Sequence, residues 1–175
     1  MKNTARIAGF FYLITFVAGS LLLVFPTGQF ASNIIADVAY LAVTVLFYRI
    51  FKPVNRNLSL LAALFSLFGI IVGALNVFHI ASVNVNPLGF FGFYCLLIGY
   101  LIIRSTFLPR ILGVLMALGG LSWLTFFSPV LAAKLYPYNL APGIFGEGVL
   151  TLWLLAMGLN EKRWEEQASH NTQGI

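Results

Sequence analysis

Charged residues are scarce in this chain. Only 9% of its 175 residues are Asp, Glu, Lys or Arg, and 60% are hydrophobic, whereas a typical soluble domain has about 25% charged residues. The mean hydropathy is +0.94. This composition excludes a soluble globular domain and predicts an all-α integral membrane protein. At this length the membrane helices leave no room for a separate soluble domain, so we expect a single transmembrane domain over residues 1–160.

The sequence also lacks most signatures of known chemistry. It has no P-loop, no G-x-G-x-x-G after a strand and no C-x-x-C pair. The single cysteine, Cys95, cannot form an intrachain disulfide, and its place in an apolar run favours an unreactive thiol. Transmembrane haem needs axial ligands such as paired histidines, but His79 is the only histidine in an apolar run. We therefore expect no cofactor.

Six apolar runs are long enough, or nearly so, to cross a bilayer as helices. A crossing takes ~20 apolar residues, and the fourth and fifth runs are short by that measure. The first run is longer than the ~7 to 15 residue core of a secretory signal, so we interpret it as a retained helix. The predicted spans cover residues 7–25, 30–51, 58–81, 88–103, 111–127 and 140–159.

The basic residues predict the orientation of these spans. Nine of the ten Lys and Arg residues precede span one, follow span six, or lie between spans two and three or four and five. Lys134 alone lies on the opposite side. Because basic residues concentrate on the cytoplasmic side, we expect both termini in the cytoplasm and the chain in the inner membrane. The net charge of +5 is then a topology signal; lipid is the expected partner and nucleic acid is not. Residues 161–175 are predicted to form a frayed, polar cytoplasmic tail.

Two acidic residues are exceptions, because Asp37 and Glu147 each lie inside an apolar run. A carboxylate in hydrocarbon costs roughly 2.5 to 3.5 kcal/mol on insertion scales, so such groups usually face a bundle interior or a watery cavity. Each acid lies ~10 Å from the outer end of its span at 1.5 Å per residue. Each belongs to a stripe with helical spacing: Asn33, Asp37, Tyr40, Thr44 and Tyr48 in span two, and Gly143, Glu147, Thr151, Leu154 and Gly158 in span six.

Other polar side chains are expected at a similar depth. Asn76 and His79 lie near the outer end of span three, and side chains three or four apart share a helix face. We therefore predict a ligand-binding pocket in the outer half of the membrane. Its residues are Asp37, Asn76, His79 and Glu147, with Tyr12, Tyr40 and Thr151 lining it.

Three functions are compatible with this cluster. Its groups can bind a small molecule, a cation or a proton in transit, as in a binding or transport protein. They can instead bond to one another and only lock the helices together, as in a structural or accessory protein. The third function is a metal-dependent intramembrane enzyme, since one His and two carboxylates form a ligand set for zinc or iron, but no H-E-x-x-H pair exists.

Small and aromatic residues add expectations about packing. Small residues let helices approach closely, which predicts helix-packing faces at Gly92, Cys95 and Gly99 in span four and at Gly113 and Ala117 in span five. Aromatic residues near span ends are typical of interfacial anchors. We assign that role to Trp123, Tyr136 and Tyr138 at the outer interface and to Trp164 at the inner one.

Four ordered strings add a family resemblance. They are residues 6–14 (RIAGFFYLI), 47–56 (FYRIFKPVNR), 93–101 (FYCLLIGYL) and 108–115 (LPRILGVL). Together they resemble the bacterial membrane family named domain of unknown function 4386 (DUF4386). The resemblance covers nearly the whole chain and implies a compact multi-helix membrane domain. It implies no particular activity, substrate or catalytic residue.

Overall fold

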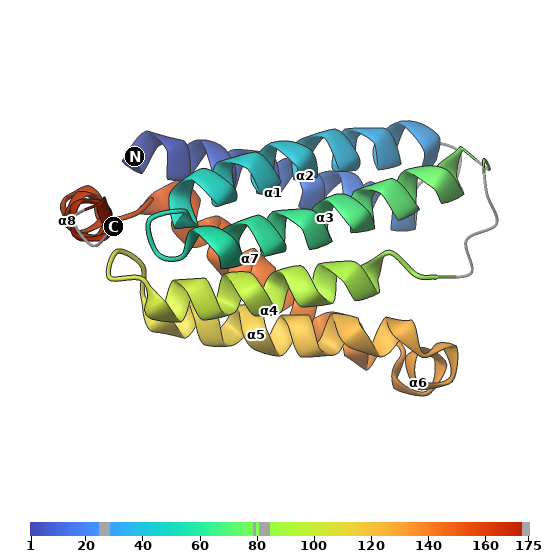
Figure 1. Ribbon diagram of the computed structural model, residues 1–175. Helices are drawn as coiled ribbons and strands as arrows, with labels where there is room; N and C mark the ends of the chain where they lie inside the picture. The colour runs from blue at the N-terminus through green and yellow to red at the C-terminus, as the bar shows by residue number, and fades with distance from the viewer. Residues whose placement is uncertain (25–28, 79, 81–84, 173–175) are drawn as a thin grey trace.

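The computed structural model describes residues 1–24, 29–78, 80 and 85–172 (Figure 1). Within these residues the chain is helical and contains no strand. The helices are α1 (Lys2–Val24), α2 (Gln29–Phe51), α3 (Arg56–Val77), α4 (Leu88–Arg104), α5 (Arg110–Leu124), α6 (Pro129–Leu135), α7 (Ala141–Ala156) and α8 (Glu161–Thr172). Two short 3-10 turns, η2 (Thr125–Phe127) and η3 (Tyr138–Leu140), flank α6. The all-α prediction is confirmed.

Six of these helices form a closed ring. Each of α1 to α4 packs against the next helix in the chain, and α7 closes the ring by packing against both α5 and α1. The six helices run roughly side by side (Figure 1). One end of the ring carries the basic residues at the helix ends, and we call it the basic end; it includes Arg6, Arg49, Arg56, Arg104 and Arg110.

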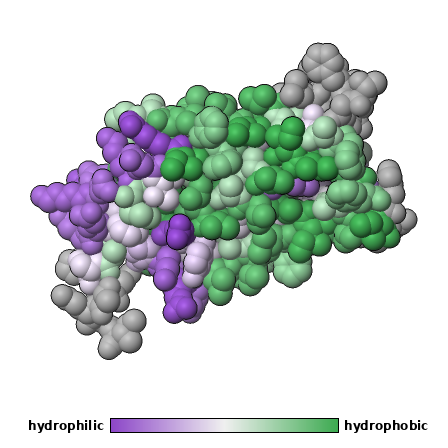
Figure 2. Space-filling model, turned by 90° about the horizontal axis from the view of Figure 1, so that it is seen from above, coloured by the Kyte–Doolittle hydropathy of each residue, from purple (hydrophilic) through white to green (hydrophobic). Residues whose placement is uncertain are grey.

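The outer surface of the ring is apolar. Large hydrophobic side chains are exposed along its helices, among them Phe10, Val38, Phe68, Leu118 and Leu152. Figure 2 shows a face that is hydrophobic along most of its length and hydrophilic at one end. Within the described residues, four helical segments are long and apolar enough to cross a membrane by length and composition: Phe30–Phe51, Arg56–Val77, Arg110–Phe127 and Tyr138–Ala156. The apolar helix Leu88–Arg104 is shorter.

The ends of two helices follow directly from local sequence. The Asn55 side chain accepts a hydrogen bond from the Leu58 amide at 2.9 Å and caps α3. Gly158 has a φ of +68° and its amide bonds the Leu154 carbonyl at 3.0 Å, which ends α7 in a left-handed turn that favours glycine. Gly158 therefore lies beyond α7, and the prediction that it continues the span-six stripe is wrong.

Glycines hold α4 and α5 together, at the packing faces that the small-residue spacing predicts. A Cβ atom added to Gly99 would lie 2.6 Å from the Gly113 carbonyl oxygen. One added to Gly120 would lie 2.7 Å from the Gly92 carbonyl oxygen. Two backbones this close leave no space for larger side chains, so α4 and α5 form the tightest pair in the ring.

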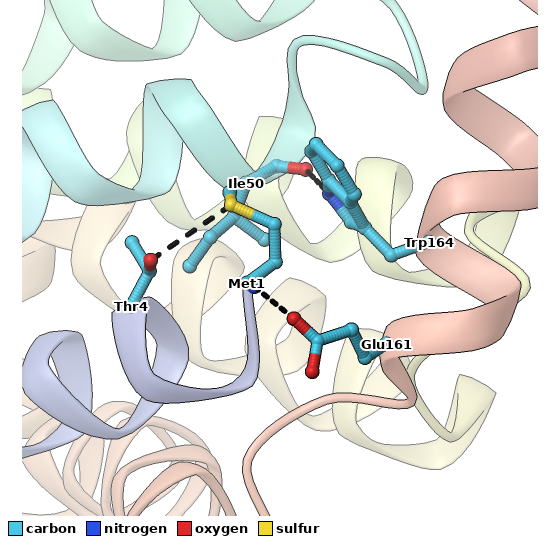
Figure 3. Close-up of polar contacts among 5 residues, drawn as sticks. All are labelled: Met1, Thr4, Ile50, Glu161 and Trp164. Carbon is cyan, nitrogen blue, oxygen red and sulfur yellow. Dashed lines mark hydrogen bonds and ion pairs between the residues drawn. The ribbon is translucent and has the colours of Figure 1, made fainter.

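The segment after α7 differs from the prediction of a frayed tail, because residues 161–172 form α8 and lie across the basic end (Figure 1). The Asn160 side chain accepts from the Arg163 amide at 3.2 Å and starts the helix. The Trp164 indole then donates to the Ile50 carbonyl at 2.8 Å (Figure 3). Gln167 accepts from the Thr106 amide at 3.0 Å. These contacts with the ends of α2 and α4 hold the segment in place.

Glu161 at the start of α8 also pairs with the amino group of Met1 (Figure 3). The hydrogen bond and charge of that ammonium lower the pKa of the Glu161 carboxyl. The side chain is about half exposed, so this ion pair contributes little to stability. Its main effect is to place Met1, just before α1, against the first residue of α8.

Candidate functional site

A central cavity of about 560 Å³ lies inside the ring. Each of the six ring helices contributes at least one residue to its wall. The contributions come from the helix halves remote from the basic end, such as Tyr12 on α1, Asp37 on α2 and Asn76 on α3. Small-ligand pockets typically occupy about 300–1,000 Å³, so the cavity is large enough for a small molecule.

Glu147 on α7 forms one side of the cavity and is fully engaged by the protein. Its Oε2 atom accepts a hydrogen bond from the Tyr12 hydroxyl at 2.6 Å. Its Oε1 atom accepts from the Trp123 indole at 2.6 Å and from the Cys95 thiol at 3.6 Å. The side chain is only 7% exposed. The carboxyl therefore joins α1, α4 and α5 to α7 through buried hydrogen bonds.

The network extends to α2 through a weaker contact. The Tyr12 and Tyr40 hydroxyls lie 3.4 Å apart, and the two rings meet edge to face with centroids 5.6 Å apart. Both residues are buried and both line the cavity. Further along α2, the Thr44 hydroxyl lies 2.6 Å from that of Ser66 on α3. The polar stripe of α2 thus faces the inside of the ring, as its spacing predicts.

Asp37 on α2 also lines the cavity, but its hydrogen bonding differs from that of Glu147. Its side chain is half-buried, and no residue in the described part of the chain donates a hydrogen bond to its carboxyl. Gly73 on the adjacent helix α3 lies beside it, where an added Cβ atom would lie 3.9 Å from the Asp37 Oδ1 atom. The absence of a side chain at Gly73 leaves open space beside this carboxyl.

Trp123 is held against Glu147 by a glycine. A Cβ atom added to Gly143, one turn before Glu147, would lie 2.2 Å from the Trp123 Cε2 atom. The indole therefore fits only because position 143 has no side chain. Trp123 is 7% exposed, so the sequence-based assignment of this residue to the outer membrane interface is wrong: its N–H group has a buried carboxylate as a partner.

The structure brings together five of the seven predicted site residues. Asp37, Asn76, Glu147, Tyr12 and Tyr40 all line the cavity. Thr151 is elsewhere: it is buried one turn beyond Glu147, and its hydroxyl donates to the Glu147 backbone carbonyl at 2.8 Å. It closes its own helix turn instead of facing the cavity, so its prediction as a lining residue is wrong. His79 lies outside the described residues.

Sequence reasoning missed several members of the site. Among them, Trp123 and Cys95 donate to Glu147, and the Phe16 and Phe91 rings line the cavity. The spacing of Gly143 and Glu147, four residues apart on α7, indicates a place where a large neighbour approaches the acid. No comparable signal distinguishes Phe91, because the chain has 17 Phe residues.

Metal-binding side chains and a hollow outside the ring are two further candidates for a site. Among the residues that the structure describes, no three His, Cys, Asp or Glu side chains come close enough to hold a metal ion. A hollow of about 840 Å³ lies at the basic end between α8 and the turn after α4. There Gln167 bonds to both the amide and the hydroxyl of Thr106, so we assign that hollow to the docking of α8.

Comparisons with known proteins identify the family but no activity. An uncharacterized protein of Archaeoglobus fulgidus is 31% identical over 132 residues, which is 71% of this chain and 78% of that relative. No solved structure matches the chain. The family described as "Domain of unknown function (DUF4386)" matches residues 27–86 and 82–158. The chain therefore belongs to the DUF4386 family, as its four sequence strings predict.

Proposed function

We propose that this protein is a six-span inner-membrane protein, with both termini in the cytoplasm, that binds or transports a small molecule or cation through its central cavity. The observation that carries this proposal is the Asp37 carboxyl, which faces the cavity without a hydrogen-bond donor in the described part of the chain. An ionisable group that faces a cavity within a membrane protein is typical of a ligand or ion site.

The proposed topology adds α1 and α4 to the four long apolar segments. The ring packs all six helices side by side, and the basic residues gather at one end of it. The positive-inside rule assigns that end to the cytoplasm. The cavity, which lies in the other half of the ring, is then in the outer half of the membrane.

Single-cysteine labelling tests this topology. Cys95→Ala supplies a background without cysteine, because Cys95 is the only one in the sequence. We expect a membrane-impermeant maleimide to label Lys134→Cys in intact cells and to label Arg56→Cys or Ser169→Cys only after permeabilisation. Labelling of all three in intact cells, or of Arg56→Cys alone, would show that the proposed orientation is wrong.

Ligand-induced stabilisation tests the binding proposal. The purified protein in detergent is heated with inorganic cations, organic amines and neutral solutes, and each compound that raises the melting temperature is tested again on Asp37→Asn. We expect at least one compound to stabilise the wild-type protein and to lose that effect in the variant. If no compound stabilises the wild type, or if all act equally on both proteins, the binding proposal is wrong.

A structural role is the second candidate, and the hydrogen bonds of Glu147 favour it. Three donors from three other helices converge on this one carboxyl, which is what a helix lock requires. The two roles are compatible, since Glu147 can hold the cavity together while Asp37 meets the ligand. A structural role alone predicts that Asp37→Asn changes neither stability nor any binding.

A further inference from the structure

We infer that the ligand of the central cavity is an organic monocation with an apolar body, such as a lipophilic amine or quaternary ion. The inference rests on the proposed binding function and narrows it to one chemical class. It is drawn from three properties of the cavity: its charge, the space beside that charge and the nature of its walls.

The ionisable groups of the cavity wall that carry a formal charge are acids. Asp37 and Glu147 line it, and no Lys or Arg is among its described lining residues. Glu147 already has three protein donors, whereas Asp37 has none in the described part of the chain. One carboxylate is thus left for the ligand. A buried charge needs a partner of opposite sign, so a ligand with one positive charge fits best.

The space for that charge lies beside Asp37. Gly73 faces the carboxyl from α3, and a Cβ atom there would meet only the Asp37 Oδ1 atom, at 3.9 Å. One turn earlier on the same helix, Gly69 is in close contact with Phe91, whose ring would lie 2.9 Å from an added Cβ atom. The two glycines therefore have different roles: Gly69 allows close packing of the Phe91 ring, and Gly73 leaves space next to the Asp37 carboxyl.

The walls of the cavity are aromatic. Phe16, Tyr40, Phe91 and Trp123 all line it, and the Tyr40 and Phe91 rings lie with centroids 4.6 Å apart. Aromatic faces attract organic cations and are the usual walls of quaternary ammonium sites. A hard divalent metal ion instead takes six or more oxygen ligands, and this lining offers one carboxyl without a protein donor. The walls favour an organic cation over a metal ion.

Three aromatic probes test the inference on the purified full chain in detergent. Tetraphenylphosphonium is the cation, tetraphenylborate has the same shape with a negative charge, and triphenylphosphine oxide is neutral. We expect labelled tetraphenylphosphonium to bind and the neutral probe not to displace it. Tetraphenylborate would pair with the labelled cation in a mixture, so it is assayed alone and should not raise the melting temperature. Asp37→Asn should weaken its binding at least about tenfold, which corresponds to ~1.4 kcal/mol.

A second variant and a control variant test whether binding depends on the space beside Asp37. Gly73→Leu keeps the acid but fills the space beside it, and should weaken binding to a similar extent. Leu also has a higher helix propensity than Gly, so this variant should fold. Glu161→Gln removes an acid at the basic end, far from the cavity, and should leave binding unchanged.

The outcomes separate this inference from the proposed function. Equal binding of tetraphenylphosphonium to wild type and Asp37→Asn, or equal displacement by the neutral probe, overturns the monocation assignment. The binding function still stands if another compound loses its stabilising effect in Asp37→Asn. If an inorganic cation or a neutral solute binds and tetraphenylphosphonium does not, the monocation assignment is wrong and the binding function stands. If no compound of either set binds, both proposals fail.

Discussion

Asp37 and Glu147 look alike in the sequence but differ in the structure. Each is a lone acid in an apolar run, and both line the same cavity. Glu147 is 7% exposed and accepts hydrogen bonds from three other helices. Asp37 is half-buried and has no donor in the described part of the chain. The comparison teaches that two acids in similar sequence surroundings can have different roles in packing: Glu147 is bonded to three other helices, while Asp37 has no donor in the described part of the chain.

The largest expected effect is the difference in stability between the variants that remove Glu147 and Asp37. Glu147→Ala leaves the Tyr12 hydroxyl and the Trp123 indole buried without their acceptor, and an orphaned buried donor costs about 1–3 kcal/mol. We expect the variant to lose ~2–5 kcal/mol in free energy of unfolding, measured in mixed micelles. Asp37→Ala removes no hydrogen bond from the described part of the chain and should change stability by less than about 1 kcal/mol. Equal losses would show that the two acids have the same structural role.

A second pair of variants tests the glycine behind the Glu147 network. Gly143→Ala places a methyl group where the Trp123 indole lies, and overpacking of this kind typically costs about 1–3 kcal/mol. Gly148→Ala is the matched control on the same helix, because nothing lies within 4 Å of its added Cβ atom. The control should be neutral or more stable, since Ala favours a helix over Gly by up to ~1 kcal/mol. Trp fluorescence should shift in the first variant only.

The smallest expected effect is the difference in stability between variants that remove the indole donors of Trp123 and Trp164. Trp123→Phe removes a buried bond to the Glu147 carboxyl, and hydrogen bonds to charged groups contribute about 1.5–3 kcal/mol. Trp164→Phe removes a bond to the Ile50 carbonyl at the half-buried basic end, worth about 0.5–1.5 kcal/mol. Denaturation curves should give a lower free energy of unfolding for Trp123→Phe than for Trp164→Phe. The reverse order would indicate that the basic end, and not the Glu147 network, limits stability.

Much of the fold follows from hydropathy and helical spacing. Apolar runs separated by Pro, Gly and basic residues predict helices close to α1, α2, α3, α4, α5 and α7, and the stripe containing Asp37 and Tyr40 does face the inside of the ring. Hydropathy does not predict α8, because the segment is polar. Its position depends on carbonyls at Ile50 and Arg104, which belong to remote parts of the chain.

The candidate site could be predicted only as far as single-helix patterns reach. Spacing along α2 and α7 places Asp37 and Glu147 on inward faces, but it does not show which donors meet them. The partners of Glu147 come from α1, α4 and α5, and only the ring arrangement brings these helices together. Thr151 has the correct spacing too, yet its hydroxyl bonds its own helix turn, a local alternative that spacing cannot distinguish.

The docking of α8 has a consequence for the order in which the chain assembles. The ribosome makes α8 after all six ring helices, yet Trp164 and Gln167 bond to carbonyls at the ends of α2 and α4. Those carbonyls therefore lack these partners until Glu161–Thr172 has been synthesised. A chain that ended at residue 160 would contain all six ring helices but would lack these bonds at its basic end, because only the last helix to be made supplies them.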